Sequence, residues 1–207
     1  LANQDKIICE TRNMNNRTAE KAKETLEDVR MDPATVSSDN GSSRFPQFDS
    51  FIVEEKEGSG GYATVYKALR KKDGATVAIK CPYANAHRSN IINEIRMLER
   101  FGGKNFVINY RNSTKYKNLE CLVLDYVEHD KPEILRKEID VFQLRWYGYC
   151  LFRALASLHK QGIAHRDVKP GNFLFSRKTN KGFLIDFNLA LDLHQKYGIA
   201  RKMKPDK

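Results

Sequence analysis

The eight residues at positions 165–172 (HRDVKPGN) constrain the fold of this chain more than any other feature. Their charged side chains and Pro-Gly pair are unsuited to the interior of a helix or a strand, so they predict a loop. A helix is predicted directly before this loop, over residues 143–160, and Gly162 follows as its terminating glycine. Short β-like segments follow at residues 173–175 and 183–185. The predicted apolar face of the helix consists of Leu144, Gly148, Leu151, Leu155 and Leu158.

The first half of the chain carries strand signals and one helix. Asp73 and Gly74, between the second and third predicted strands, form a strong hairpin signal. A helix is predicted over residues 89–100, where apolar residues recur at spacings of four and three. The predicted strands cover residues 51–53, 64–69, 77–80, 106–110 and 121–124.

Composition restricts the class of protein. Of the 207 residues, 41% are hydrophobic and 30% are charged, which fits a globular protein and excludes a wholly disordered chain. No apolar run approaches the roughly 18 residues that a membrane span needs, and the polar N-terminus is not typical of a signal peptide. The cysteines at positions 9, 81, 121 and 150 form no C-x-x-C pair, so reduced thiols are expected.

Charge divides the chain into two parts. The net charge is +10, from 36 Lys and Arg against 26 Asp and Glu, and the excess falls on residues 49–207. This excess suits nucleotide phosphate, nucleic acid or an acidic protein, without choosing among them. Residues 1–48 are polar and predicted to be a tail, with a weak helix at 18–30 and a linker at 32–46.

A glycine-rich turn joins the first two predicted strands. Its sequence, at residues 58–65, is GSGGYATV. An ordinary hairpin can have such a turn. Its glycines would also let backbone N–H groups approach phosphate oxygens without a Cβ clash.

The polar loop and the strand after it carry residues suited to phosphate chemistry. Asp167 can accept the proton of an attacking hydroxyl, Asn172 can hold a metal ion, and Lys169 can neutralise a transferring phosphoryl group. Asp186 follows an apolar strand and offers a hard oxygen ligand for Mg²⁺. Taken singly, these residues also fit a solvated turn and an ordinary strand end.

Lys80 and Glu94 form a second candidate pair. Lys80 ends the strand Val-Ala-Ile-Lys, and Glu94 lies on the predicted helix that follows. Separately they fit a surface lysine and an exposed helix glutamate. Together they predict an ion pair that holds the lysine in position.

These motifs, in this order, resemble the eukaryotic protein kinases over about residues 49–207. Lys169, in its Asp-Val-Lys-Pro context, is similar to the serine/threonine kinases rather than the tyrosine kinases. A narrower resemblance is to the cell-division-cycle-seven kinase family, especially its plant members. It rests on residues 126–129 (YVEH), 165–175 (HRDVKPGNFLF) and 186–194 (DFNLALDLH).

The resemblance implies an α+β, two-lobed protein-kinase-like fold. Its N-lobe, an antiparallel sheet with one helix, and its hinge would cover residues 49–127, and part of the helical C-lobe would cover residues 128–207. ATP and Mg²⁺ are the implied cofactors, with Mg²⁺ held by Asn172 and Asp186. Leu124 would be the gatekeeper. The implied ATP pocket consists of Glu57, Gly58, Ser59, Gly60, Gly61, Tyr62, Ala63, Val65, Ala78, Lys80, Leu124, Asp125, Val127 and Leu174.

The resemblance also implies a context for the activity. A stacked column of Leu98, His165 and Phe187 would link the two lobes. The expected partners are a protein substrate with Ser or Thr, such as MCM helicase subunits, and an activating regulatory subunit. Nuclear localisation is expected, or otherwise cytoplasmic. Neither membrane association nor direct nucleic-acid binding is expected.

Four departures from the kinase pattern qualify this interpretation. Ala63 replaces the third glycine of the turn, and Glu57 stands where an aliphatic residue usually covers the adenine. Glu57 is expected either to turn to solvent or to weaken the pocket. Asn188 replaces the glycine of D-F-G, and asparagine tolerates the positive φ of such a turn. Only 21 residues follow Asp186 and no A-P-E motif is among them, so a truncated C-lobe is expected.

Two other functions stay open from the sequence. One is a catalytically weak nucleotide-binding fragment or scaffold, because the expected C-lobe is incomplete. The other is a nucleic-acid-binding module, suggested by the basic charge. It is disfavoured because the basic residues are scattered and no known nucleic-acid-binding motif is present.

Overall fold

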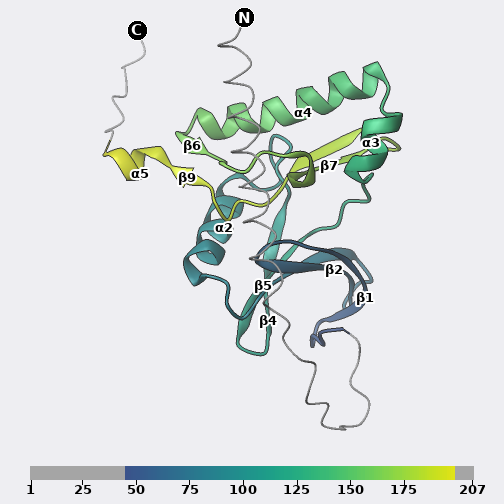
Figure 1. Ribbon diagram of the computed structural model, residues 1–207. Coiled ribbons are helices and arrows are strands. Elements are labelled where there is room, and N and C mark those ends of the chain that lie inside the picture. Colours follow the sequence, from purple (N-terminus) through teal and green to yellow (C-terminus); the bar gives the residue numbers. More distant parts are fainter. Residues whose placement is uncertain (1–44, 199–207) are drawn as a thin grey trace, which may run out of the picture. The chain divides into compact units, whose positions relative to one another are not determined.

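The computed structural model describes residues 45–198 (Figure 1). The predicted helix at 18–30 lies outside the described residues, as does nearly all of the predicted tail. No helix among residues 45–198 is both long and apolar enough to span a membrane. The elements are β1 (Phe51–Ser59), β2 (Ala63–Arg70), β3 (Thr76–Pro82), α2 (Arg88–Phe101), β4 (Tyr110–Tyr116), β5 (Leu119–Asp125), α3 (Pro132–Glu138), α4 (Val141–His159), β6 (Ile163–Ala164), η1 (Pro170–Asn172), β7 (Phe173–Ser176), β8 (Lys181–Leu184), β9 (Leu191–Asp192) and α5 (Leu193–Tyr197).

A five-stranded antiparallel sheet forms the first half, in the order β1-β2-β3-β5-β4. The predicted Asp73-Gly74 turn joins β2 to β3. Gly74 has a φ of 68°, and the Asp73 carboxylate accepts a hydrogen bond from the N–H of Ala75 at 3.2 Å. Both features are typical of a tight turn in which glycine and aspartate are favoured.

The sheet separates two hydrophobic cores. Along β3, Val77, Ile79 and Cys81 belong to one core, together with Phe48 from the segment before β1. Ala78, between them, packs against the other core. Because side chains alternate along a strand, Lys80 lies on the same side as Ala78, facing α2. Strand periodicity therefore brings the lysine to the interior side of the sheet.

The second core joins α2 to α4 and to the β7–β8 hairpin. Figure 1 shows α4 running beside β7, and α4 also contacts β8. The predicted apolar face of α4 is partly wrong, since Leu144 is 55% exposed. Leu158 is buried as predicted, Leu151 and Leu155 are partly buried against the core, and Cys150 and Ala154 complete the buried face. Two of these side chains are small, which lets the hairpin approach the helix closely.

Other boundaries differ from the prediction for local reasons. The strand predicted over residues 106–110 begins only at its last residue, Tyr110, as β4, and Asn105 and Phe106 have φ values of 46° and 63°. Helix α3 was not predicted, because Leu135 is its one buried residue and its sequence has no apolar stripe. α4 begins two residues earlier than predicted, because Asp140 and Gln143 form a capping box at its N-terminus.

The cysteines within the described range agree with reduced thiols. Cys81, Cys121 and Cys150 are free and buried. Cys9 lies outside the described residues.

Candidate active site

A cavity of about 270 Å³ lies beneath the glycine-rich turn between β1 and β2. Every residue that the sequence analysis assigned to a nucleotide pocket lines it, from Glu57 to Leu174. Glu94, Asn172 and Asp186 line it as well. Tyr126 also lines it and lies in the predicted hinge, residues 125–127, whereas Ile108, His129, Gly171 and Ile185 line it without having been predicted.

The glycine-rich turn leaves room around its backbone. A Cβ atom added to Gly58 or Gly61 would meet no atom within 4 Å. The turn is held by its neighbours, because the Tyr83 hydroxyl donates to the carbonyl of Gly60 at 3.2 Å. The N–H of Tyr83 donates to the carbonyl of Tyr62 at 2.8 Å. The backbone of the glycine-rich turn is thus uncrowded by side chains and is held by hydrogen bonds to Tyr83, which suits the approach of a phosphate group.

Glu57 lies at the mouth of the cavity. Its carboxylate accepts a hydrogen bond from the Tyr126 hydroxyl at 3.4 Å, and both residues line the cavity. Glu57, which departs from the kinase pattern, is exposed. Its hydrogen bond to Tyr126 connects it to the chain segment after β5.

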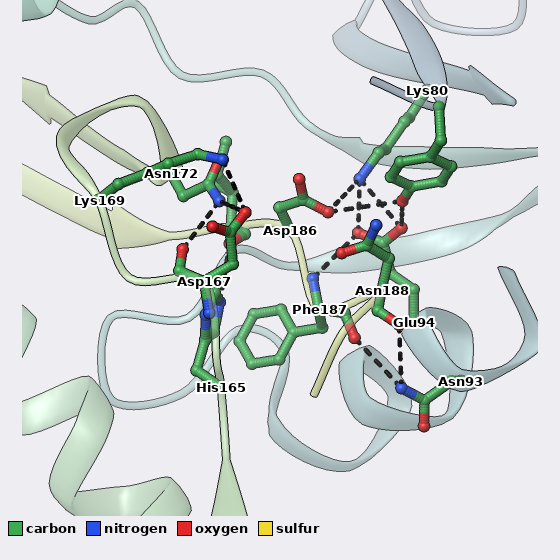
Figure 2. A network of polar contacts seen from close by, with 12 residues as sticks. Lys80, Asn93, Glu94, His165, Asp167, Lys169, Asn172, Asp186, Phe187 and Asn188 are labelled. Carbon is green, nitrogen blue, oxygen red and sulfur yellow. Dashed lines mark hydrogen bonds and ion pairs between the residues drawn. The ribbon is translucent and has the colours of Figure 1, made fainter. Parts of the chain in front are cut away.

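Lys80 is the centre of a buried ionic group (Figure 2). Its Nζ lies 2.8 Å from Oε1 of Glu94 and 2.9 Å from Oδ1 of Asp186. Lys80 is 7% exposed and Glu94 is 1% exposed. Glu94 shares the inner face of α2 with Ile91 and Leu98, which explains how a charged residue comes to be buried there. The Asp186 side chain is 22% exposed and lies at the edge of this group. We call Lys80, Glu94 and Asp186 the buried ionic group.

Tyr62 from the glycine-rich turn joins the buried ionic group. Its hydroxyl donates to Oε2 of Glu94 and, at 3.5 Å, to Oδ1 of Asp186. The Nζ of Lys80 lies 4.6 Å from the centre of its ring. Burial, reinforced by both carboxylates, raises the pKa of Tyr62 far above its ordinary value, so the hydroxyl remains a donor. The sequence shows an aromatic residue here but not its rotamer, so this contact was not predicted.

Asp167, Lys169 and Asn172 form a second group, in which Lys169 is exposed, Asp167 is half-buried and Asn172 is buried. Oδ2 of Asp167 accepts from Lys169 Nζ at 2.7 Å and from Asn172 Nδ2 at 2.8 Å. The Lys169 hydrogen bond, with help from Asn172, holds the pKa of Asp167 below its usual value. Asp167 is therefore ionised at neutral pH and can accept a proton only transiently. We call Asp167 and Lys169 the exposed pair.

His165 fixes the start of the polar loop from inside the core. It is 2% exposed, and its Nε2 lies 3.0 Å from the carbonyl oxygen of Ile185. Nδ1 accepts the N–H of Asp167 at 3.3 Å. Burial lowers the pKa of His165, which agrees with a neutral ring that donates through Nε2. Its ring packs against that of Phe187, with centroids 4.8 Å apart.

The segment around Asp186 differs from what asparagine in place of glycine led us to expect. Asn188 is not among the described residues with positive φ, whereas Asp186 has a φ of 66°. The left-handed backbone conformation therefore occurs at Asp186, two residues before Asn188. Asn188 consequently does not need the freedom that glycine would provide.

Asn172 and Asp186 offer the oxygen atoms suited to a divalent cation. The N–H of Ile185 donates to the carbonyl of Asn172 at 3.0 Å, so the two segments lie together. The amide nitrogen of Asn172 binds Asp167, which leaves its side-chain oxygen for a ligand. Residues 45–198 hold no cluster of three or more His, Cys, Asp or Glu fit for a metal. Two protein oxygens fit Mg²⁺, which usually completes its shell with waters and substrate phosphates.

Comparison with known families agrees with this geometry. Residues 51–204 match the protein kinase domain. The probable serine/threonine-protein kinase cdc7 of Dictyostelium discoideum is 35% identical over 155 residues, covering 73% of this chain and 15% of that protein. The human cell division cycle 7-related protein kinase is 32% identical over 153 residues, covering 72% and 27%. The cell cycle serine/threonine-protein kinase hsk1 of Schizosaccharomyces pombe is 34% identical over 114 residues, covering 55% and 22%.

These relatives are much longer than the matched region. The chain spans between 15% and 27% of the length of these three proteins. The resemblance to cell-division-cycle-seven kinases therefore covers only a part of each of these proteins.

Proposed function

Because the chain belongs to the protein kinase family, we propose that it transfers the γ-phosphoryl group of ATP to serine or threonine hydroxyls of a protein. The observation that carries the proposal is the single cavity in which the glycine-rich turn, Lys80, Glu94, Asn172 and Asp186 meet. Kinase catalysis is mainly positioning and charge stabilisation, which this arrangement of groups can supply.

The adenine would occupy the apolar part of the cavity. Val65, Ala78 and Leu174 line this part, and Leu124 is paired with Ala78 across β3 and β5. Residues 125–127 would offer backbone groups to the base edge. Lys80, kept in place by Glu94, would contact the α- and β-phosphates.

Asp186 and Asn172 would hold Mg²⁺. When bound, the cation would neutralise negative charge on the phosphates. Lys80 lies 2.9 Å from Asp186, so the lysine and the cation would share one carboxylate. Both positive charges would then lie near the same phosphates.

The exposed pair would perform the transfer step. The Asp167 carboxylate would orient the substrate hydroxyl and receive its proton as the new O–P bond forms and the bond to the ADP oxygen breaks. Lys169 would offset charge on the transferring group. Neither residue lines the cavity, so the substrate hydroxyl would approach from outside it.

We infer the biological role from the relatives' names and from the family resemblance. The named relatives are cell-cycle and cell-division-cycle kinases. A role in the cell cycle and in the initiation of DNA replication follows, with MCM helicase subunits as substrates, an activating regulatory subunit and residence in the nucleus.

Labelled phosphate transfer tests the function. The whole chain is incubated with γ-labelled ATP, Mg²⁺ and a Ser/Thr-containing protein, beside Asp167→Asn and the control Asp49→Asn. Asp49 is an exposed residue outside the cavity. We expect label on serine or threonine with the wild type and Asp49→Asn, and at least a hundredfold less with Asp167→Asn. Equal labelling by Asp167→Asn would sink the proposal. Nucleotide binding without transfer by the wild type would favour a scaffold instead.

A further inference from the structure

Asn93 on α2 binds the backbone that follows Asp186. Its side-chain nitrogen lies 2.8 Å from the carbonyl oxygen of Ala190, 3.3 Å from that of Asn188 and 3.4 Å from that of Phe187. Figure 2 shows the amide pointing toward the Phe187 and Asn188 backbone. An amide nitrogen has two hydrogens, so it satisfies the nearest acceptor and shares the second hydrogen between the others.

Glu94, the next residue on the helix, binds the same segment as a hydrogen-bond acceptor, whereas Asn93 binds it as a donor. Its Oε1 accepts the N–H of Phe187 at 3.3 Å while also pairing with Lys80. Two consecutive residues of α2 thus bind one stretch of backbone: Asn93 donates to its carbonyl oxygens, and Glu94 accepts from one of its N–H groups. This stretch cannot shift relative to α2 without breaking hydrogen bonds of both kinds.

The segment needs such support because its own structure is irregular. Residues 185–190 belong to no strand or helix. Asp186 holds a left-handed backbone conformation that is uncommon for non-glycine residues, although aspartate and asparagine adopt it more readily than the others. The orientation of the Asp186 carboxylate therefore depends on contacts from outside the segment.

We propose that Asn93 is a positioning residue that fixes the backbone of residues 187–190 and thereby aims the Asp186 carboxylate for a divalent cation. The inference deepens the proposed function and rests on it, because it concerns cation binding at the same site. Asn93 does not line the cavity, so it acts through the backbone rather than on the nucleotide. Sequence reasoning missed it because a partly buried helix asparagine carries no motif.

Nucleotide binding with and without Mg²⁺ tests the first consequence. A fluorescent ATP analogue is titrated into the whole chain and into Asn93→Leu and Asn93→Asp. The first variant removes the donor, and the second presents carboxylate oxygens to the carbonyls. We expect each to weaken the Mg²⁺-dependent affinity about five- to tenfold, the loss of one or two hydrogen bonds. Affinity without Mg²⁺ should change less than about twofold. Asn90→Asp, which adds the same charge in the first turn of α2, should leave both affinities unchanged.

Combining Asn93→Leu with Asp186→Asn shows whether Asn93 acts by positioning Asp186 or only by stabilising the surrounding structure. If Asn93 acts through Asp186, Asn93→Leu should change the Mg²⁺ response of the Asp186→Asn background by less than about twofold. An equal loss with and without Mg²⁺, or the same loss in both backgrounds, would show a merely structural role.

Hydrogen exchange decides the inference independently of nucleotide. In Asn93→Leu, the amides of residues 187–190 should exchange at least about tenfold faster, while those of β2 and β3 keep their rates. Unchanged exchange at residues 187–190 would overturn the inference. If the wild type binds no nucleotide, the proposed function fails, and exchange still shows whether Asn93 holds the segment.

Discussion

The buried ionic group and the exposed pair lie at one site but are built in opposite ways. The side chains of Lys80 and Glu94 are 9% and 1% exposed, whereas those of Lys169 and Asp167 are 56% and 27% exposed. In Figure 2 the exposed pair lies on one side of the Asp186 carboxylate, and Lys80 and Glu94 lie on the other side. The same chemical pair, a lysine with a carboxylate, thus occurs in two environments.

This difference separates structural from chemical roles. A buried ion pair leaves an uncompensated charge when one partner is removed, at a large cost in stability. An exposed ion pair contributes little to stability, because water solvates each partner. Substitutions in the buried ionic group should therefore damage both the fold and the site, and those in the exposed pair should damage the site alone.

The largest expected effect is that of Lys80→Met on stability. The change leaves Glu94 buried without its cation, so the free energy of unfolding should fall by about 3–5 kcal/mol. Urea denaturation measures it. The matched control is Lys169→Met, whose unfolding midpoint should stay at the wild-type value. Equal shifts in the two variants would remove the distinction between the groups.

The second effect is that of Lys169→Ala on transfer. Losing the positive charge beside the transferring group should reduce phosphate transfer roughly ten- to a hundredfold at saturating ATP. The urea midpoint should not move. A rate loss that appears only at low ATP would instead assign Lys169 to nucleotide binding.

The third effect, that of Tyr62→Phe on ATP binding, is smaller and is a gain instead of a loss. The Tyr62 hydroxyl contacts the carboxylates of Glu94 and Asp186, which the proposed nucleotide site would use, so it would compete with phosphates and the cation. Tyr62→Phe should tighten ATP binding about two- to tenfold, the range of one hydrogen bond, without changing adenosine binding. Calorimetric titration compares the two ligands. Tyr110→Phe, which removes a hydroxyl bound to Ser113, is the control. Weaker ATP binding by Tyr62→Phe would show that the hydroxyl assists the ligand.

The smallest effect is a pH dependence from His165. Burial lowers its pKa in the folded protein, so below about pH 6.5 the unfolded chain binds the proton more readily. His165 therefore lowers stability as the pH falls from about 6.5 toward its folded pKa, and has no such effect above that window. The unfolding free energy of the wild type should fall more steeply between pH 7 and 5.5 than that of His165→Gln. Parallel slopes would mean that other groups dominate.

Sequence reasoning was most successful where the chemistry depends on spacing. The alternation of β3 and the period of α2 bring Lys80 and Glu94 together, and both patterns can be read from residue order. The family membership and the antiparallel sheet were also predictable, because the motifs occur in a fixed order.

Features that depend on rotamers and tertiary contacts could not be predicted. Neither the inward turn of Tyr62 nor the Asn93 contacts leave a periodic signal. On α4, Leu144 was wrongly assigned to the buried face because leucines at helical spacing suggest burial, and the buried Cys150 and Ala154 were not predicted. The positive φ at Asp186 likewise could not be predicted, because aspartate tolerates this conformation but does not require it.

The most direct test of the account is phosphate transfer per folded molecule at saturating ATP for Asp167→Asn beside Lys80→Met. Each sample is corrected for its folded fraction, which urea denaturation provides. The account predicts that Asp167→Asn loses at least a hundredfold in transfer while its unfolding midpoint matches the wild type. Lys80→Met should lose both transfer and stability. Undiminished transfer by folded Asp167→Asn would contradict the assignment of the chemical step to the exposed pair.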